Sequence, residues 1–101
     1  MKFAFHHKAK KELEESVLYY ESCRLGLGLE FAEEVYSAIN RICTYPDAWA
    51  ILSKKTRHCL VNRFPYSIVY QHVNGSVRII AIANLRRKPD YWQSRIHLFE
   101  E

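Results

Sequence analysis

The sequence predicts an α+β fold, in which an N-terminal strand and a helical hairpin pack on a twisted antiparallel sheet. Apolar residues recur at steps of three and four up to Pro46 and then alternate with polar residues, so the spacing changes from that of a helix to that of a strand. The chain has 101 residues, of which 49% are hydrophobic and 26% charged, as in ordinary globular proteins. Because a chain of this length builds one two-layer core, we expect a single domain over residues 1–101.

The first half of the chain predicts a short strand followed by two helices. Phe3 and Phe5 alternate with smaller or polar neighbours, as in a strand. Helical spacing follows over about residues 7–22 and again from 31 to 42, and Glu12 is expected on the polar face of the first helix. Gly26 and Gly28 separate the two helices, and glycines can take positive φ angles and let the chain reverse. Two helices joined by so short a loop form an antiparallel hairpin.

The second half predicts antiparallel strands. Four segments are rich in Val, Ile and Tyr, near Ala50–Ser53, Arg57–Asn62, Ser67–Val73 and Ser76–Asn84. Asn74-Gly75 between the last two segments is typical of a tight hairpin turn. Strict alternation places Val77, Ile79 and Ala81 on one face of the last strand, and Ile80 and Ile82 on the other. Since both faces are apolar, this strand is expected to be central, with the helical hairpin covering one side.

The cysteines and the lack of long apolar runs predict a cytoplasmic protein. Cys23, Cys43 and Cys59 form no C-x-x-C motif and are odd in number, which favours free thiols in a reducing compartment. The N-terminus does not resemble a signal peptide, and no stretch approaches the roughly 20 apolar residues of a membrane span. We expect no metal and no cofactor. His6 and His7 are expected to point to opposite faces of a strand and to be solvated or to cap a helix.

Known catalytic signatures are missing from the sequence. It contains no G-x-x-x-x-G-K-[ST], H-E-x-x-H, G-x-S-x-G or G-x-G-x-x-G motif, which argues against nucleotide hydrolysis and zinc proteolysis. Cys59 follows His58, but neighbours on a strand diverge, so Cys59 is expected to be a small buried thiol. Trp92 is expected to close the core, as are Trp49, Phe64 and Tyr66.

Positive charge is concentrated in the sheet half. The formal net charge of +4 divides into −2 over residues 1–50 and +6 over residues 51–101. Nine cations lie between positions 54 and 95 with Asp90 as the one acid among them: Lys54, Lys55, Arg57, Arg63, Arg78, Arg86, Arg87, Lys88 and Arg95. Tyrosines and a tryptophan are interleaved with them, and cations beside stacking surfaces suit phosphate backbones and unstacked bases. An acidic protein segment is an equal alternative, and a scattered basic surface that serves solubility is a third.

Two sets of residues, in their order and spacing, resemble the RelE/ParE superfamily of bacterial toxins from type II toxin–antitoxin systems, closest to its ParE-like branch. The first half matches in Ala9, Glu12-Leu13, Tyr19-Tyr20-Glu21, Leu25-Gly26-Leu27-Gly28, Phe31, Val35, Ala38-Ile39, Ile42, Pro46 and Trp49. The second half matches in residues 63–70 (RFPYSIVY) and 86–95 (RRKPDYWQSR). The resemblance covers nearly the whole chain. It implies a β-α-α-β-β-β fold and a toxin that a cognate antitoxin holds inactive, as in plasmid stabilisation.

The resemblance implies one of two activities. RelE-like members cleave messenger RNA on the ribosome, with cations holding the phosphate that the substrate's own 2′-hydroxyl attacks. ParE-like members poison DNA gyrase and have no established chemistry of their own. For a ribonuclease, the chain offers Arg57 and Arg86 as phosphate clamps, His58 as the base and Tyr91 as the acid. It departs from that pattern at Ser67, where the ribonucleases typically carry an arginine.

The sequence therefore favours a ParE-like gyrase inhibitor over an enzyme. The expected target-binding residues are Arg57, Arg63, Arg86, Arg87, Lys88 and Tyr91. The expected partners are DNA gyrase and an antitoxin segment with acidic and apolar residues, which brings the toxin into a higher assembly. A ribosome-dependent endoribonuclease and a decayed toxin that only binds antitoxin are the alternatives. Whether Tyr91 is buried or presented at the site is left open by the sequence.

Overall fold

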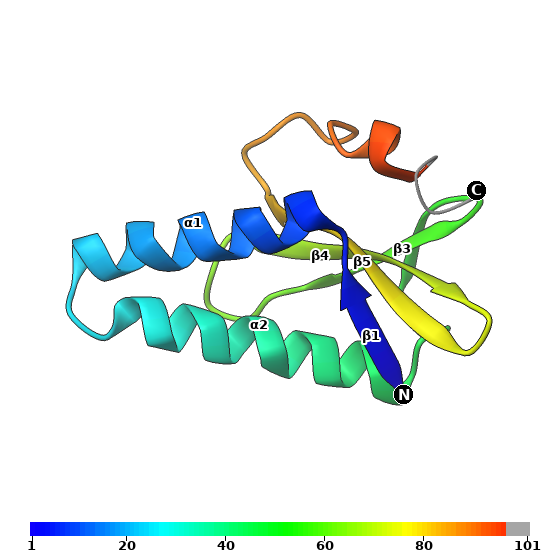
Figure 1. The fold of residues 1–101 in the computed structure, drawn as a ribbon, viewed down its shortest axis with the longest axis horizontal. Helices are drawn as coiled ribbons and strands as arrows, with labels where there is room; N and C mark the ends of the chain where they lie inside the picture. The colour runs from blue at the N-terminus through cyan, green and yellow to red at the C-terminus, as the bar shows by residue number, and fades with distance from the viewer. Residues whose placement is uncertain (97–101) are drawn as a thin grey trace.

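The chain forms a sheet of five strands with two long helices. The structure is a computed structural model that describes residues 1–96. Its elements, in chain order, are β1 (Lys2–Phe5), α1 (His7–Cys23), α2 (Leu27–Thr44), β2 (Ala50–Ser53), β3 (Thr56–Leu60), β4 (Tyr66–Val73), β5 (Ser76–Asn84) and a short 3₁₀ helix, η1 (Gln93–Arg95) (Figure 1). No helix in the described part is both long and apolar enough to cross a membrane.

The sheet has the strand order β1-β5-β4-β3-β2, which confirms that β5 is central. Strands β2 to β5 pair antiparallel, whereas β1 pairs parallel to β5. The sheet is therefore mixed, because the chain crosses over through the helices before it returns beside β1. Relative to the β-α-α-β-β-β order, the described sheet has one more short strand, β2, at the segment predicted near residues 50–53.

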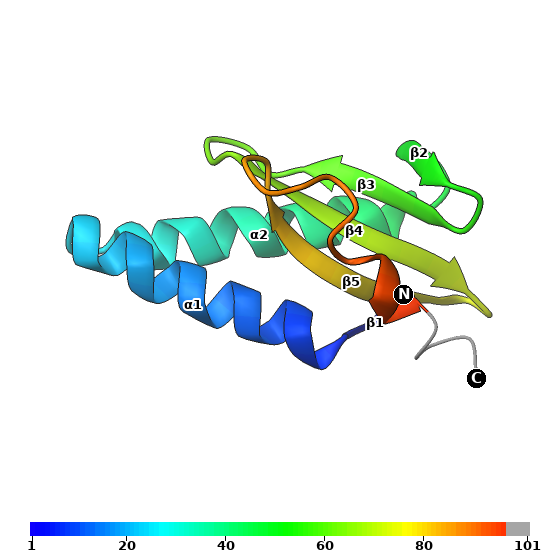
Figure 2. The same cartoon turned by 90° about the horizontal axis from the view of Figure 1, so that it is seen from above.

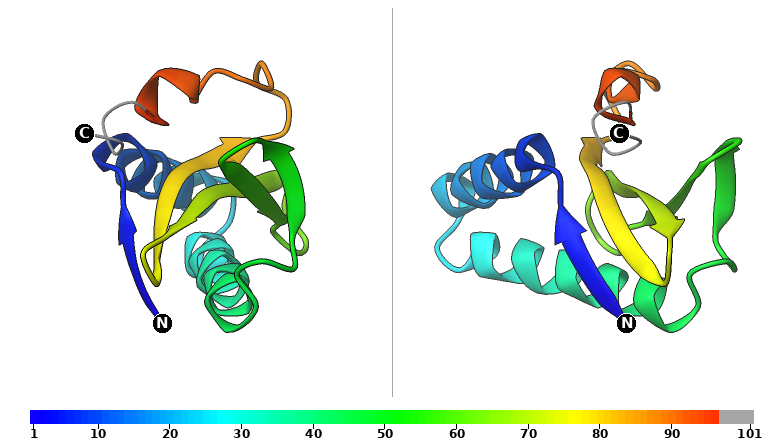
Figure 3. Two further views of the ribbon diagram at one scale, coloured as in Figure 1. Left: turned by 90° about the vertical axis from the view of Figure 1, so that its right-hand side faces the viewer. Right: turned by 45° about the vertical axis from the view of Figure 1, so that its right-hand side comes forward.

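Helices and the C-terminal segment cover opposite faces of the sheet (Figure 3). The helix-side core includes Phe31, Val35, Ile39, Tyr70, Val77, Ile79 and Ile82. The outer core consists of Val69, Ile80, Ala81, Ala83, Trp92 and Ile96. Seen from above, the chain after β5 passes back over β4 and β5 (Figure 2). Trp92 and Ile96 of this segment belong to the outer core and close that face. The structural role predicted for Trp92 is confirmed, since it is 3% exposed.

A β-bulge changes which side chains of β5 face the helices. Val69 pairs with Ala81 and Tyr70 with Ile79, so Ile80 has no partner of its own on β4. As a result, Ile80 and Ala81 both join the outer core, and Ile82 returns to the helix side. The alternation predicted from sequence was wrong for Ala81 and Ile82, because it assumed an unbroken register.

The two glycines between the helices serve different purposes. Gly26 has a φ of +87° and reverses the chain, as predicted. Gly28 lies inside α2 and has no positive φ. Instead it allows close helix packing, because a Cβ atom there would lie 2.6 Å from the carbonyl oxygen of Val17. The hairpin predicted at Asn74 and Gly75 is confirmed by φ angles of 52° and 73°.

Candidate functional site

The carboxylate of Glu12 joins helix α1 to the C-terminal segment. Oε2 accepts hydrogen bonds from Tyr91 Oη at 2.7 Å and Arg95 Nη2 at 2.9 Å. Oε1 accepts from Arg95 Nη1 at 2.9 Å and from the amide of Ile82 at 3.1 Å. Only 12% of the Glu12 side chain and 8% of the Arg95 side chain are exposed. Charged hydrogen bonds shielded from water in this way hold the C-terminal segment firmly against the sheet.

This ion pair lies where strand β1 stops covering the edge of β5. The β1–β5 pairing ends at Phe5 and Ile79. Just beyond that point on β5, the carbonyl oxygen of Ile80 accepts from Arg95 Nη1 at 3.0 Å, and the amide of Ile82 donates to Glu12. The two side chains thus satisfy backbone groups that a neighbouring strand would otherwise pair.

The pairing of Glu12 with Tyr91 and Arg95 was not predicted from the sequence. Glu12 was expected on the polar face of its helix, and Arg95 among the cations of the sheet half. Instead the two side chains pair with each other away from solvent. Spacing alone does not separate a solvated carboxylate from one covered by a distant segment. One signal was present in the sequence: both residues belong to the motifs that carry the family resemblance.

Tyr91 is half-buried, with its hydroxyl turned inward. It donates that hydroxyl to Glu12, and burial together with this bond raises the pKa of Tyr91 well above its usual range. The guanidinium of Arg87 lies 3.7 Å from the centroid of the tyrosine ring and 3.4 Å from Glu12 Oε2. A general acid must donate its proton to the substrate. In this arrangement Tyr91 keeps its proton, and the hydroxyl points to Glu12 and not to a substrate.

The residues before Tyr91 form an exposed loop, which we call the cationic loop (residues 85–90). Its base is fixed by Asn84, which accepts from the amide of Arg86 through its side chain at 2.9 Å and from the amide of Arg87 through its carbonyl at 3.0 Å. Arg86 and Lys88 are exposed. The loop therefore presents Arg86 and Lys88 to solvent on an anchored base, beside Arg87, which is exposed and packs on the Tyr91 ring.

His58 lines a cavity of about 210 Å³ beneath the cationic loop. Its lining also includes Ser67, Arg87, Lys88, Tyr91 and Trp92. The Nδ1 atom of His58 lies 2.8 Å from Ser67 Oγ, and burial lowers the pKa of His58 below 6.5. The imidazole is consequently neutral at pH 7 and able to accept a proton. Four of the predicted site residues, His58, Arg87, Lys88 and Tyr91, meet at this cavity.

Arg57 lies on the opposite face of the sheet from His58. It pairs with Tyr70 of the helix-side core, whereas His58 pairs with Val69 of the outer core. The Nη1 atom of Arg57 donates to the carbonyl oxygen of Trp49 at 2.8 Å. The four residues considered for a ribonuclease therefore do not converge: His58 and Tyr91 share a cavity, and Arg57 lines another one.

Arg63 pairs with acidic side chains of α2. Its Nη2 atom is 2.7 Å from Glu30 Oε1, and its Nη1 atom is 3.8 Å from Glu34 Oε2, both on α2. The bond from Arg63 lowers the pKa of the Glu30 carboxyl. The predicted target-binding residues are thus divided among three places: the loop, the α2 side and the cavity of Arg57.

The remaining candidate ligands and thiols have structural roles. His6 caps α1, since its Nδ1 atom accepts from the amide of Lys8 at 3.0 Å, which confirms the predicted capping. The rings of His6 and His7 stack at 4.4 Å between centroids; the expected divergence was wrong, because His6 lies beyond the end of β1. Within residues 1–96, no three His, Cys, Asp or Glu side chains are grouped to hold a metal. Cys59 is buried, as predicted, and burial raises its pKa.

A helical hairpin on a mixed five-stranded sheet, closed on its outer face by a C-terminal segment, gives the chain a ParE-like α+β fold. A solved chain of the chromosomal ParDE TA system from P. aeruginosa superposes with a TM-score of 0.72 at 15% sequence identity. The match covers 85% of the present chain and 97% of the other. It confirms, at the level of the fold, the resemblance predicted from sequence. The chain matches no family model and no curated protein.

Proposed function

We propose that this chain is the toxin of a type II toxin–antitoxin system and that it acts by docking on DNA gyrase. The observation that carries the proposal is the shared fold with a chain of a ParDE TA system, which extends over 97% of that chain. The sequence motifs favour the ParE-like branch independently. Gyrase is the target that this branch implies.

Docking without catalysis is supported by the geometry of the site. A ribonuclease of this size needs its base, acid and phosphate clamps within reach of one phosphate. Here Arg57 is on the other face of the sheet, and the hydroxyl of Tyr91 is held by Glu12. The cationic loop, by contrast, offers Arg86 and Lys88 to a partner without rearrangement.

An antitoxin segment with apolar and acidic residues fits the helices and the cationic loop. Several large apolar side chains on the helical hairpin are exposed, among them Leu18, Leu25 and Leu29 at 70%, 89% and 65%. Exposed apolar groups of this kind are typical of interfaces. Leu18→Asp with Leu29→Asp is therefore expected to abolish antitoxin capture, whereas Lys11→Asp, also on the exposed surface of α1, retains it.

A second function, endoribonuclease, is favoured by one observation. His58 is a neutral base in a cavity that also holds Arg87, Lys88 and Tyr91. For this activity the Tyr91 hydroxyl has to leave Glu12 when the substrate binds, and Arg87 has to turn from the Tyr91 ring to a phosphate.

Induced expression in bacteria without antitoxin distinguishes these functions. Gyrase poisoning predicts growth arrest with gyrase-linked DNA breaks and no new transcript ends. Ribonuclease activity predicts new 5′ ends in translated transcripts by primer extension, which His58→Gln removes. Normal growth in the presence of the folded protein contradicts both and leaves a chain that only binds antitoxin.

A further inference from the structure

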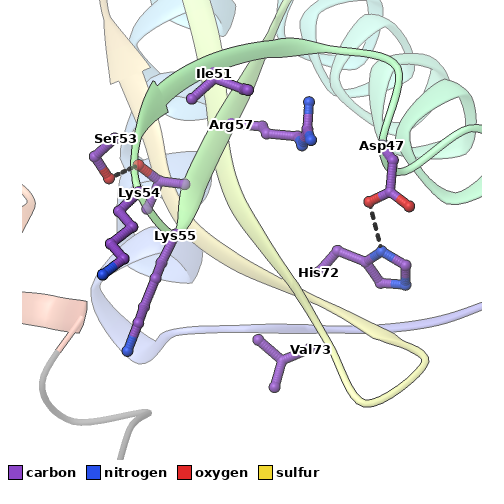
Figure 4. Close-up of a pocket in the computed structure, with 9 residues that line it drawn as sticks. Asp47, Ile51, Ser53, Lys54, Lys55, Arg57, His72 and Val73 are labelled. Atoms are coloured by element: carbon purple, nitrogen blue, oxygen red, sulfur yellow. Dashed lines mark hydrogen bonds and ion pairs between the residues drawn. The ribbon is translucent and has the colours of Figure 1, made fainter.

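A second cationic cavity lies at the opposite end of the sheet from the cationic loop. It has a volume of about 290 Å³ and is bounded by the β2–β3 turn, the end of β4 and the segment after α2 (Figure 4). Strand β4 runs from Tyr66, which pairs with Asn84 beside the cationic loop, to Val73 at this cavity. Eight residues at about 3.3 Å each separate the two places by roughly 25 Å.

Four basic side chains line this cavity: Lys54, Lys55, Arg57 and His72. Figure 4 shows the two lysines on one side, His72 on the other and Arg57 between them. Asp47 is the one acidic side chain in the lining. The described lining therefore has a net positive charge even when the histidine is neutral.

Two of these groups are held in place before any ligand arrives. Arg57 donates from Nη1 to the carbonyl oxygen of Trp49 at 2.8 Å, which fixes its guanidinium. The Nδ1 atom of His72 lies 2.9 Å from Asp47 Oδ1, which orients the imidazole ring. The pKa of the Asp47 carboxyl is lowered, mainly by the hydrogen bond from His72. The positive charge of Arg57 makes a smaller contribution in the same direction. The preorganised guanidinium of Arg57 loses little entropy when it binds a ligand.

We propose that this cavity binds a phosphate group, carried either by a polynucleotide backbone or by a free nucleotide. Three cations against one carboxylate in the lining suit an anion, and a phosphate has several strong acceptor oxygens to share among them. The guanidinium supplies a fork of donors, and the lysines supply mobile point charges. The apolar side chains of Ile51 and Val73, which complete the lining, leave room for the group attached to the phosphate. This inference does not depend on the proposed toxin function.

Titration of the ¹⁵N-labelled full chain with inorganic phosphate tests the site. We expect saturable shifts at the amides of residues 53–57 and 72–73. Lys54→Gln with Lys55→Gln is expected to weaken binding about tenfold, since two nearby charges are lost. Asp47→Asn is expected to strengthen binding, because it removes the competing carboxylate. Lys10→Gln with Lys11→Gln on α1 removes the same charge elsewhere and is the matched control.

Three results would each overturn the proposal. They are an equal loss of phosphate affinity in the Lys10/Lys11 control, shifts that do not saturate, and tighter binding of acetate than of phosphate. Two further probes, adenosine monophosphate and a single-stranded oligonucleotide at equal phosphate concentration, identify the source. Tighter binding of the oligonucleotide, with a salt dependence that falls in the Lys54/Lys55 variant, supports a backbone phosphate. Equal affinities support a single nucleotide phosphate.

Discussion

Glu12 shows how one side chain connects distant parts of this chain. It receives bonds from β5, from Tyr91 and from Arg95, residues that follow it by 70 to 83 positions. Because the ion pair with Arg95 is buried, either partner alone leaves an uncompensated charge away from water. This carboxylate is therefore one of the groups that hold the C-terminal segment in position.

Glu12→Gln is expected to destabilise the protein by about 3–5 kcal/mol, the usual cost of removing one partner of a buried ion pair. The measurement is the free energy of unfolding in denaturant. Glu14→Gln, on an exposed position of the same helix, is the control and should change stability by less than about 0.5 kcal/mol. Equal stability of the two variants would contradict the role given to Glu12.

His58 gives a prediction about pH. The pKa of His58 is 6.5 in the unfolded chain, and burial lowers it in the folded chain. At pH values between the folded and the unfolded pKa, the unfolded chain therefore binds more protons than the folded one. This contribution to stability is present above pH 6.5 and is lost as the pH falls toward the folded pKa. Histidine NMR titration should place the His58 midpoint below 6.5, and His58→Gln should reduce the fall in stability. A midpoint above 6.5 would contradict the burial of this ring.

At the scale of elements, Trp92 anchors the C-terminal segment to the outer face of the sheet. Among the described residues it is the largest member of the outer core, whose other residues are aliphatic. Trp92→Ala is expected to cost about 3–5 kcal/mol in unfolding free energy, as for other buried aromatic residues. Gln93→Ala, at an exposed neighbouring position, should leave stability unchanged. A small change in unfolding free energy for Trp92→Ala would contradict the role of Trp92 in stabilising the outer face of the sheet.

The helices, the strands and the central place of β5 could be predicted from sequence, because local periodicity and turn residues determine them. The parallel β1 and the bulge at Ile80 could not, since they depend on how distant strands pair. The candidate site was predicted in part. His58, Arg87, Lys88 and Tyr91 meet at one cavity, whereas Arg57 was expected with them and lies on the other face. That difference follows from the alternation of side chains along β3, which puts neighbours on opposite faces.

For the whole molecule, the net charge of +4 is less informative than its distribution. Arg63 faces acids of α2, and Arg95 is buried against Glu12. Among the exposed cations of the sheet half, Arg86, Arg87 and Lys88 lie in the cationic loop, and Lys54 and Lys55 lie beside the Arg57 cavity. A small domain with basic groups at two ends suits docking on a large partner, because long-range attraction then guides its approach.

Inhibition of purified DNA gyrase tests the central claim most directly. In a supercoiling assay, the folded wild-type chain is expected to inhibit gyrase. Arg86→Gln with Lys88→Gln should inhibit it about tenfold less well, since the solvent-facing cations of the loop are lost. Lys10→Gln with Lys11→Gln, which removes the same charge from α1, should inhibit as the wild type does. Full supercoiling activity at a large molar excess of the folded wild-type chain would contradict the account.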